Sequence, residues 1–350
     1  MLLEAEKKMI YYLASGIQKW EQDKTVVPEE LIQGLHLLQK FVLENQNANP
    51  IEYYPNNVYD LLPFLQKPFE EWKLGDLDNL IDPQAAILDA TGRLGDYVDQ
   101  WLGEIESIES AEQDHVKQIL MYCRQHQLQD QYVQIRLFIM DHPVVDYLSL
   151  QQLLMSIDSN LVELVLACYE EIAFDQAPIY LCPYCGWTLS HRKGDYYCAP
   201  PCHKKEDFRE LDQSLSRQGT VQFRLRPGIH RYTLVPGLAE REIKQNLEKQ
   251  GFKVEWYPDI DTYDLRIRHD EDVIDLDIKD YCHPRLLAEH LSKTDRSKYR
   301  NQALIVIPDY HEREYPNYTG RVKQYLRKMG IDNTPTIMLE RHLYQSLRRH

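Results

Sequence analysis

The sequence predicts a multidomain protein with an all-α N-terminal half, a short cysteine-rich module and a C-terminal α/β domain with a mixed central sheet. Three observations predict this division. Apolar residues recur at helical spacing in the first half, four cysteines cluster in the middle, and apolar strands alternate with helices after them. We therefore expect three domains, over residues 1–175, 176–215 and 216–350, which a chain of 350 residues is long enough to form.

The N-terminal half is predicted to be helical. The stretches "LLEAEKKMIYYLASGIQKW" and "PEELIQGLHLLQKFVLEN" repeat apolar residues every three or four positions, and Pro28 before two glutamates is a typical helix start. Further helices are expected near 111–127, 130–140, 149–157 and 160–174. This half contains no catalytic motif, so its acidic helices suit either a scaffold that binds partner proteins or a structural role.

Localisation follows from the first residues and the cysteines. "MLLEAEKKMI" is charged and lacks the apolar run of a signal peptide, and "LVELVLACY" is too short to cross a bilayer. Seven cysteines without an export signal are typical of a reducing compartment. We therefore expect a cytoplasmic protein whose clustered cysteines bind metal.

The cysteine-rich module has the spacing of a zinc site. Cys182, Cys185, Cys198 and Cys202 form the pattern C-x2-C-x12-C-x3-C, in which each pair suits a tight turn and the intervening residues suit a short β-hairpin. This pattern predicts a zinc ribbon, with His203 as the alternative to Cys202 as the last ligand. Because four protein ligands leave no open coordination position, we expect a structural and not a catalytic zinc ion.

The last third alternates strands and helices. Strands are expected near 220–225, 230–234, 252–257, 264–268, 273–279, 303–307 and 335–339, and helices near 238–250, 284–293, 319–329 and the C-terminus. Gly251 and Gly330 follow the last periodic residues of two of these helices, where a left-handed cap favours glycine. This order of elements predicts an α/β domain with a mixed sheet.

Charge is distributed unevenly along the chain. Residues 1–175 have a net charge of −19 and residues 176–350 a net charge of +4. Without its acidic segment 259–280, the second half carries a net charge of +10. A basic surface around an acidic patch suits a protein that binds phosphates and metal ions, although a solvated surface of uneven charge is the alternative.

The acidic segment reads as a β-hairpin. Alternation in "VIDLDIK" places its aspartates on the face opposite to its apolar residues. A four-residue loop at 269–272 would pair residue 268 with residue 273, so that Asp264 lies opposite Asp277 and Arg266 faces Asp275. Two carboxylates about 5 Å apart destabilise a strand pair unless a cation lies between them.

Asp264 and Asp277 are therefore candidate ligands of a divalent metal ion, Mg²⁺ or Mn²⁺. Lys279 follows on the same face, where it can orient a water molecule or stabilise developing negative charge. Glu240 lies on the apolar stripe of the preceding helix and is expected to be an auxiliary ligand or base, or else a glutamate that caps its helix. The alternative for the hairpin is a solvent-facing ribbon whose acids keep an edge strand soluble.

This arrangement resembles the PD-(D/E)xK nuclease superfamily, which has the restriction-endonuclease-like fold, over residues 236–340. Asp264 matches the first acidic position of the family, Asp277-Ile278-Lys279 matches its D/E-x-K element, and Glu240 matches a helix glutamate common in members. The resemblance implies a Mg²⁺-dependent endonuclease with a possible homodimer for double-strand cleavage.

One departure concerns the "PD" element, because Pro258-Asp259 comes too early to be the strand aspartate; Asp259 and Asp261 are second candidates. More narrowly, "YPDIDTYDLRI" and "VIDLDIKDYCHPRLLAEHL" behind a zinc ribbon look like the nuclease of bacterial anti-phage islands that encode a PIWI-like protein and a helicase. This resemblance implies defence against foreign DNA, with those proteins as partners.

Two functions remain open from the sequence. The first is an endonuclease that hydrolyses phosphodiester bonds in DNA. The second is a non-cleaving clamp for nucleic acid that recruits partner proteins. Retention of Asp264, Asp277 and Lys279 together favours the enzyme. Basic residues beyond the motif are either phosphate contacts or solvated helix faces, among them Arg285, Lys293, Arg296, Lys298 and Arg300.

Overall fold

The computed structural model describes residues 2–44, 53–74, 77, 81–104, 108–172, 179–192, 195–198, 214–215, 221–269, 272–294, 296–299, 303–331 and 335–348. The chain divides into two compact units. Unit 1 comprises residues 1–105 and 281–289, and unit 2 comprises residues 106–280 and 290–350. This division by contacts differs from the three expected domain ranges, which stay a prediction.

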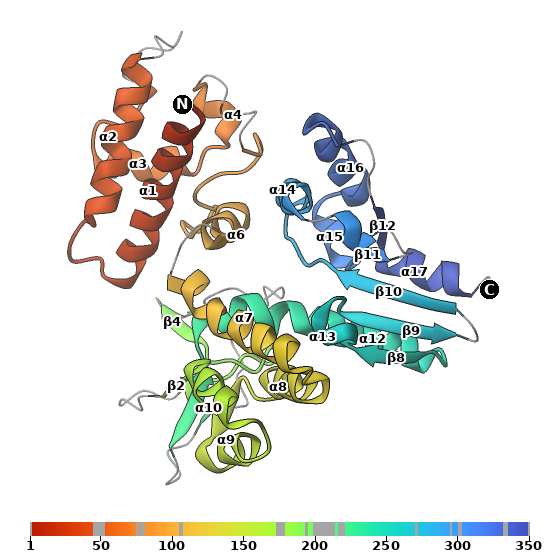
Figure 1. Cartoon of the computed structure of the whole chain (residues 1–350). Coiled ribbons are helices and arrows are strands. Elements are labelled where there is room, and N and C mark those ends of the chain that lie inside the picture. Colours follow the sequence, from red (N-terminus) through yellow and green to blue (C-terminus); the bar gives the residue numbers. More distant parts are fainter. Residues whose placement is uncertain are drawn as a thin grey trace. The chain divides into compact units, whose positions relative to one another are not determined.

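Unit 1 is helical, as the apolar periodicity predicts (Figure 1). Its helices before residue 105 are α1 (Leu2–Gln22), α2 (Glu29–Glu44), α3 (Val58–Leu65), α4 (Phe69–Trp72) and α6 (Asp96–Glu104). Helix α2 begins directly after Pro28, as expected. The core contains the rings of Phe64 and Phe69, each packed on Trp72, and all three are almost fully buried.

A segment from much later in the chain completes unit 1. Tyr281–Glu289 includes the start of α14 (Pro284–Lys293), and its Leu286 lies in the same apolar core as the N-terminal helices. His283 pairs with Asp82 in a buried position. The N-terminal helices are therefore packed on residues that follow the candidate catalytic strand directly.

Unit 2 begins with a helical layer. Its helices are α7 (Ile108–His126), α8 (Gln129–Asp141), α9 (Tyr147–Leu154) and α10 (Ser159–Ala167). A small antiparallel sheet of order β1-β7-β2 joins them, formed by β1 (Val144–Asp146), β7 (Gln222–Leu225) and β2 (Tyr169–Glu171). Two short ladders follow α10 along the chain: β3 (Ile179–Tyr180) with β6 (Ser214–Leu215), and β4 (Ser190–Arg192) with β5 (Asp195–Tyr197).

The central sheet of unit 2 has five strands in the order β12-β11-β10-β9-β8. The strands are β8 (Lys253–Trp256), β9 (Leu265–His269), β10 (Asp272–Ile278), β11 (Leu304–Ile307) and β12 (Thr336–Leu339). Strands β8, β9 and β10 are antiparallel neighbours, whereas β10, β11 and β12 run parallel. The sheet is therefore mixed, as predicted.

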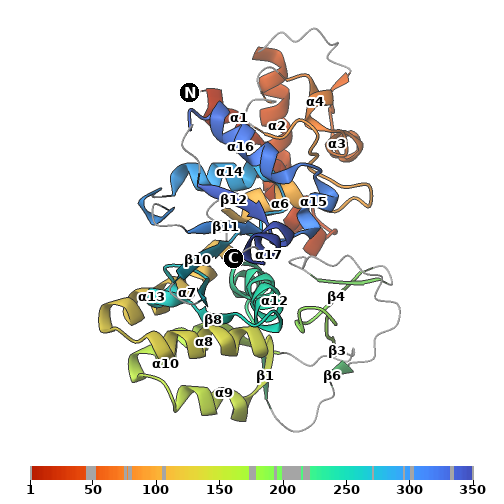
Figure 2. The same ribbon diagram turned by 90° about the vertical axis from the view of Figure 1, so that its right-hand side faces the viewer.

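Further helices and helical turns lie before, between and after these strands. They are α11 (Pro227–Ile229), the π-helical turn η2 (His230–Leu234), α12 (Val235–Lys249), α13 (Pro258–Asp261), η3 (Arg296–Tyr299), α15 (Tyr310–Glu314), α16 (Tyr318–Lys328) and α17 (Glu340–Leu347). Among them, α12 and α17 pack on the sheet through apolar residues: Ile243 and Leu247 of α12 share one buried cluster with Leu265, Leu276 and Leu343. Figure 2 shows α12 and α17 beside the strands. None of the described helices combines the length and apolar character that a membrane span requires.

Most expected elements are confirmed, and one is wrong. Gly251 and Gly330 adopt the predicted left-handed conformation, with φ of +94° and +76°. The strand expected at 230–234 is instead the π-helical turn η2, which runs without interruption into α12. Its β-branched and aromatic residues favour a strand locally, but Pro227 starts a helical turn, and His230 of η2 is buried in the core of unit 2.

Candidate active site

The β9–β10 hairpin has the predicted register. Arg268 pairs with Val273, and the ladder continues to the pair Leu265–Leu276. The next residue on each strand is Asp264 and Asp277. The main-chain N–H of Asp264 donates to the carbonyl of Leu276 at 3.0 Å. The loop length and the alternation of apolar residues therefore bring the two candidate ligands to the same end of the hairpin.

The second predicted pair on this face is also present. Arg266 donates from Nε to Asp275 Oδ1 at 2.6 Å and from an Nη to Oδ2 at 3.1 Å. A further contact joins Arg266 to Asp259 at 2.7 Å. These two carboxylates are therefore neutralised within the hairpin, and Asp259 is drawn away from a role as metal ligand.

Asp277 is the most enclosed carboxylate of the site, with 1% of its surface exposed. Lys298 donates to Oδ1 at 2.9 Å, while the Tyr299 hydroxyl donates to Oδ2 at 2.6 Å. Lys279 Nζ lies 3.0 Å from Oδ2. Burial raises the pKa of Asp277, but Lys279, Lys298 and Tyr299 outweigh it and lower the pKa to about 2.

Two of these partners come from η3, about twenty residues downstream of the strand. The sequence pattern indicates Lys298 only as a phosphate contact, and it does not indicate that Tyr299 belongs to the site. The structure places both against Asp277. The other proposed phosphate contacts differ among themselves: Lys293 is exposed, Arg296 and Arg300 lie outside the described side chains, and Arg285 is buried.

Arg285 belongs to unit 1 and has partners there. Its guanidinium donates to the main-chain oxygen of Ile81 at 2.9 Å and to Glu289 at 3.1 Å. Because only 8% of Arg285 is exposed, the expectation that it contacts phosphate is wrong. Its charge is used inside the helical unit.

Asp264 lies in an environment that disfavours its ionised form. Its Oδ2 accepts a hydrogen bond from the main-chain N–H of Ile278 at 2.5 Å. Burial raises the pKa of Asp264 well above its usual value, and the charges of Glu240 and Asp277 add to this, while Lys279 opposes it. The site therefore has a surplus of carboxylates at this position.

Glu240 faces inward from α12, as its place on the apolar stripe predicts, and 4% of its surface is exposed. The Tyr257 hydroxyl donates to Glu240 Oε2 at 2.6 Å, and a guanidinium nitrogen of Arg136 lies 3.7 Å from the same oxygen. Burial raises the pKa of Glu240, although Arg136 and the Tyr257 hydrogen bond oppose this. The capping alternative does not describe this position, since α12 begins five residues earlier, at Val235.

His290 is a further neighbour that the sequence did not indicate. It lies in α14, and burial together with the charge of Lys279 lowers its pKa to about 4, with Lys298 acting in the same direction and Asp277 opposing. The imidazole is therefore neutral at physiological pH.

Residues 237–350 match the family model described as an REase associating with pPIWI_RE. This region is a restriction-endonuclease-like domain. The match contains the whole five-stranded sheet, with Glu240, Asp264, Asp277 and Lys279, and it confirms the predicted resemblance. No curated protein and no solved structure matched the chain.

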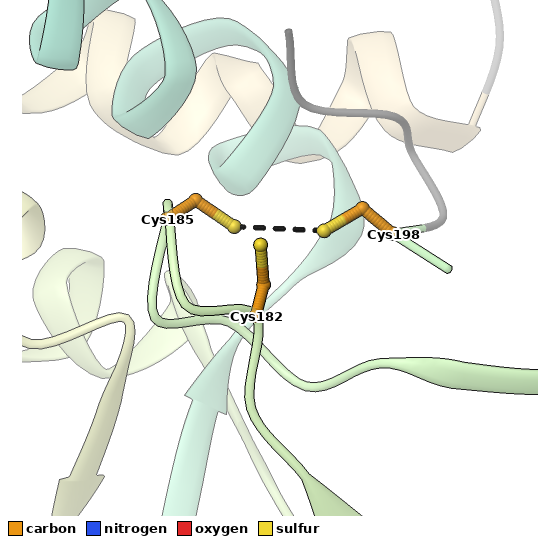
Figure 3. A group of neighbouring side chains, drawn as sticks. All are labelled: Cys182, Cys185 and Cys198. Carbon is orange, nitrogen blue, oxygen red and sulfur yellow. Dashed lines mark hydrogen bonds between the residues drawn. The ribbon is translucent and has the colours of Figure 1, made fainter. Parts of the chain in front are cut away.

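Upstream of the restriction-endonuclease-like domain, three of the predicted zinc ligands converge. The sulfur atoms of Cys182, Cys185 and Cys198 lie within 4.8 Å of one another and are buried (Figure 3). The Cys185–Cys198 sulfur separation is 3.7 Å. A tetrahedral zinc ion with Zn–S bonds of about 2.3 Å would space its sulfur ligands about 3.8 Å apart. The described sulfur atoms therefore fit zinc, while Cys202 and His203 lie outside the described residues.

The turn that carries the first two cysteines is well formed. Gly186 donates to the carbonyl of Cys182 at 2.8 Å, and Cys182 donates to the carbonyl of Trp187 at 2.7 Å. Gly186 adopts a φ of +71°, which the tight turn requires and which side chains disfavour. The β4–β5 hairpin then leads to Cys198, as the twelve-residue spacing predicts.

His230 links the cysteine cluster to the start of the restriction-endonuclease-like domain. It is fully buried in η2, its Nε2 lies 3.4 Å from Cys185 Sγ, and its ring stacks on Trp187 at 4.5 Å between centroids. Sequence reasoning missed this contact, because residues 230–234 were expected to form a strand. The cluster therefore touches the helical turn that leads directly into α12.

Proposed function

We propose that the protein is a metal-dependent endonuclease that hydrolyses phosphodiester bonds in DNA. The observation that carries this proposal is the Asp277–Lys279 pair, 3.0 Å apart, at the end of a hairpin that also presents Asp264. The pair lies in a restriction-endonuclease-like domain. A module that only bound nucleic acid would have no need of a lysine beside two inward-facing acids.

The donor set suits Mg²⁺ or Mn²⁺. Asp264 and Asp277 would hold the ion, with Glu240 as an auxiliary ligand or as a base acting through water. The raised pKa of Asp264 supports this, because a doubly charged cation would offset the negative charges that now disfavour its ionisation. When bound, the ion would lower the pKa of a water molecule and offset charge on the scissile phosphate.

The side chains around the ion would position the reacting groups and stabilise the charge that develops. In the hydrolysis, a water oxygen forms a bond to phosphorus and the bond from phosphorus to the leaving sugar oxygen breaks. The water proton passes to solvent or a nearby base, and the leaving oxygen takes up a proton from solvent. Lys279 donates hydrogen bonds to the water or to the phosphate oxygens that gain charge. Lys298 and Tyr299 fix the orientation of Asp277, each through one carboxylate oxygen.

The test is a plasmid-nicking assay with the full chain and Mg²⁺. We expect cleavage that requires the metal ion and falls at least about 100-fold in Asp277→Ala and in Lys279→Ala, as when a group that stabilises a transition state is removed. The matched control is Asp275→Asn, on the same strand and face but paired with Arg266, and it should cut like wild type.

The outcomes separate the candidate functions. Equal cutting by wild type, Asp277→Ala and Lys279→Ala would place the activity at another site or in a contaminant. DNA binding by wild type without cutting, in the presence of the partner proteins as well, would instead support the non-cleaving clamp.

The biological setting follows from the family description. Because the matched family associates with pPIWI_RE, we infer that a PIWI-like protein is a partner, with a helicase of the same defence island as a second one. The proposed role is defence against foreign DNA. The acidic helices of unit 1 are the proposed contact for partner proteins, and a homodimer would supply the two sites that double-strand cleavage needs.

The zinc site would be structural. Cys182, Cys185 and Cys198 would hold Zn²⁺ with Cys202 as the fourth ligand, which leaves no open position for catalysis. His230 would then donate from Nε2 to the Cys185 thiolate, as residues beside zinc ligands commonly do. The ion would thereby fasten the ribbon to the start of α12.

A further inference from the structure

A buried arginine from the helical layer reaches the candidate active site. Arg136 of α8 lies between two carboxylates, with one guanidinium nitrogen 3.7 Å from Glu240 Oε2 and the other 3.4 Å from Asp261 Oδ2. Its guanidinium also lies over the ring of Tyr257, 4.6 Å from the centroid. Only 9% of Arg136 is exposed. Helix α8 thus brings a buried positive charge to Glu240 from outside the matched region 237–350.

Tyr257 connects this arginine to Glu240. The Arg136 guanidinium donates to the Tyr257 hydroxyl at 3.2 Å, and the hydroxyl donates to Glu240 Oε2 at 2.6 Å. Both the hydroxyl and the guanidinium therefore contact the same carboxylate oxygen. This arrangement restricts the rotation of the carboxylate, and both of these contacts leave Oε1 uninvolved.

The segment that carries Tyr257 is strained. Tyr257, Asp259, Ile260 and Asp261 all have positive φ, at 45°, 54°, 51° and 59°. Side chains other than glycine rarely adopt this conformation, and it persists only when the surroundings hold it in place. Such strain is concentrated at functional sites in proteins, and here it directly precedes Asp264.

The α7–α8 hairpin holds the strained segment through its backbone. Arg124 donates to the carbonyls of Ile260 and Asp261, both at 2.9 Å. Gln129 donates to the carbonyl of Tyr257 at 3.0 Å and accepts from the N–H of Ile260 at 2.7 Å. Because these bonds satisfy main-chain groups that the unusual conformation leaves outside regular structure, the hairpin determines where the segment lies.

Helix α8 is also packed tightly on α12, the helix that carries Glu240. A Cβ added at Gly237 would lie 2.5 Å from Met140 Sδ, so a larger residue there would displace the Met140 side chain. An ion pair between Arg241 and Asp141, at 2.6 Å, joins the same two helices nearer the surface. The position of Arg136 relative to Glu240 is therefore set by side-chain contacts between α8 and α12.

We propose that Arg136 and Tyr257 are positioning residues for Glu240, and that the α7–α8 hairpin thereby completes the metal site of the nuclease. In this arrangement Oε2 is occupied by the positioning contacts, and Oε1 is the oxygen offered to the metal ion or to its water. A purely structural role explains the arrangement less well, because an ion pair buried this deeply is often no more stabilising than apolar residues of similar size. The inference rests on the proposed function and deepens it.

The test compares variants of the full chain by two measurements. The first is Mn²⁺ binding by calorimetry in the absence of DNA, and the second is the Mg²⁺ concentration that gives half-maximal nicking. Tyr257→Phe removes only the hydroxyl and keeps the ring beneath Arg136, so it is the principal variant. Arg136→Met removes the charge, and Arg136→Lys keeps it without the planar fork.

We expect Tyr257→Phe and Arg136→Met to weaken Mn²⁺ binding about 10-fold or more and to raise the half-maximal Mg²⁺ concentration similarly, since removing an outer partner of a metal ligand has effects of this size. Arg136→Lys, which keeps the positive charge, should weaken Mn²⁺ binding less than Arg136→Met does. The matched control is Arg241→Gln, which breaks the other α8–α12 ion pair and should bind Mn²⁺ like wild type.

A double-variant cycle distinguishes positioning from general stability. If Tyr257 acts through Glu240, then Tyr257→Phe should have no further effect on Mn²⁺ binding in a Glu240→Gln background, whereas independent effects would add. Additive losses would overturn the proposal. So would Tyr257→Phe binding Mn²⁺ as tightly as Arg241→Gln.

Failure of the proposed function has a different signature. A wild-type protein that neither binds Mn²⁺ nor cuts DNA would refute the nuclease, and the positioning role would fall with it. A wild type that does both, beside an unaltered Tyr257→Phe, would refute the positioning role alone. If Arg136→Met does not fold, as a thermal unfolding curve would reveal, the isosteric Tyr257→Phe still decides.

Discussion

Replacing Asp277 by asparagine should destabilise the metal-free protein, because its carboxylate is the counter-charge of two lysines. The pKa of Asp277 is raised by burial but lowered further by Lys279, Lys298 and Tyr299, from 3.8 to about 2. This difference of about two units corresponds to about 2.5 kcal/mol of folding free energy at neutral pH. Asparagine imitates the protonated carboxyl group in shape and charge, so its substitution should remove about this amount.

The sign of the pH dependence follows from the same shift. Because the folded-state pKa is lower than the unfolded one, the stabilisation by Asp277 is complete above about pH 5 and is lost as the pH falls toward 2. The difference in unfolding free energy between wild type and Asp277→Asn should therefore be constant from pH 7 to 5. It should shrink at lower pH.

Urea unfolding of the full chain in a chelating buffer measures this difference. We expect Asp277→Asn to lose about 2.5 kcal/mol at pH 7, while Asp272→Asn, an exposed position on the same strand, should stay within about 0.5 kcal/mol of wild type. Asp277→Asn that is as stable as wild type, or more so, would refute the assignment of Lys279 and Lys298 as its counter-ions.

Three other outcomes are expected. Asp264→Asn should raise the thermal unfolding temperature in chelator while abolishing metal-dependent cleavage, since burial and neighbouring carboxylates disfavour the ionised Asp264; a lowered unfolding temperature would contradict this. Elemental analysis should find about one zinc per chain, and Cys182→Ser should lose it and unfold at lower temperature than a Cys123→Ser control; a protein without zinc would remove the assignment. Deleting residues 1–105 should give poorly soluble protein in a sedimentation assay, because Leu286 loses its apolar core; a soluble fragment that unfolds cooperatively would argue otherwise.

Sequence reasoning succeeded where the determinants are local. The register of the β9–β10 hairpin depends on its loop length and on the alternation of apolar and polar residues along its strands. Both can be read directly from the sequence. The same holds for the turn at Cys182 and for the glycine caps. Glu240 was placed correctly because the helical period alone decides which face it occupies.

The remaining features depend on contacts between distant residues. Lys298 and Tyr299 reach Asp277 from η3, and nothing in the intervening sequence indicates that this chain segment returns to the strand end. Arg136 lies more than 100 positions before Glu240, in a helix whose pattern shows only ordinary amphipathicity. The turn at His230 was misjudged because its residues prefer strands, a preference that packing against Trp187 overrides.

Because Asp277 is buried between two lysines, DNA and the metal ion would influence each other's binding to the proposed nuclease. A divalent ion that binds this carboxylate would compete with the ammonium groups of Lys279 and Lys298, which already pair with it. The affinity for the ion would therefore be lower than three neighbouring carboxylates alone would give. A DNA phosphate that attracts Lys298 would vacate Oδ1 for the ion. Substrate and metal ion would then raise each other's affinity by the same factor, so that DNA would lower the metal concentration needed to fill the site.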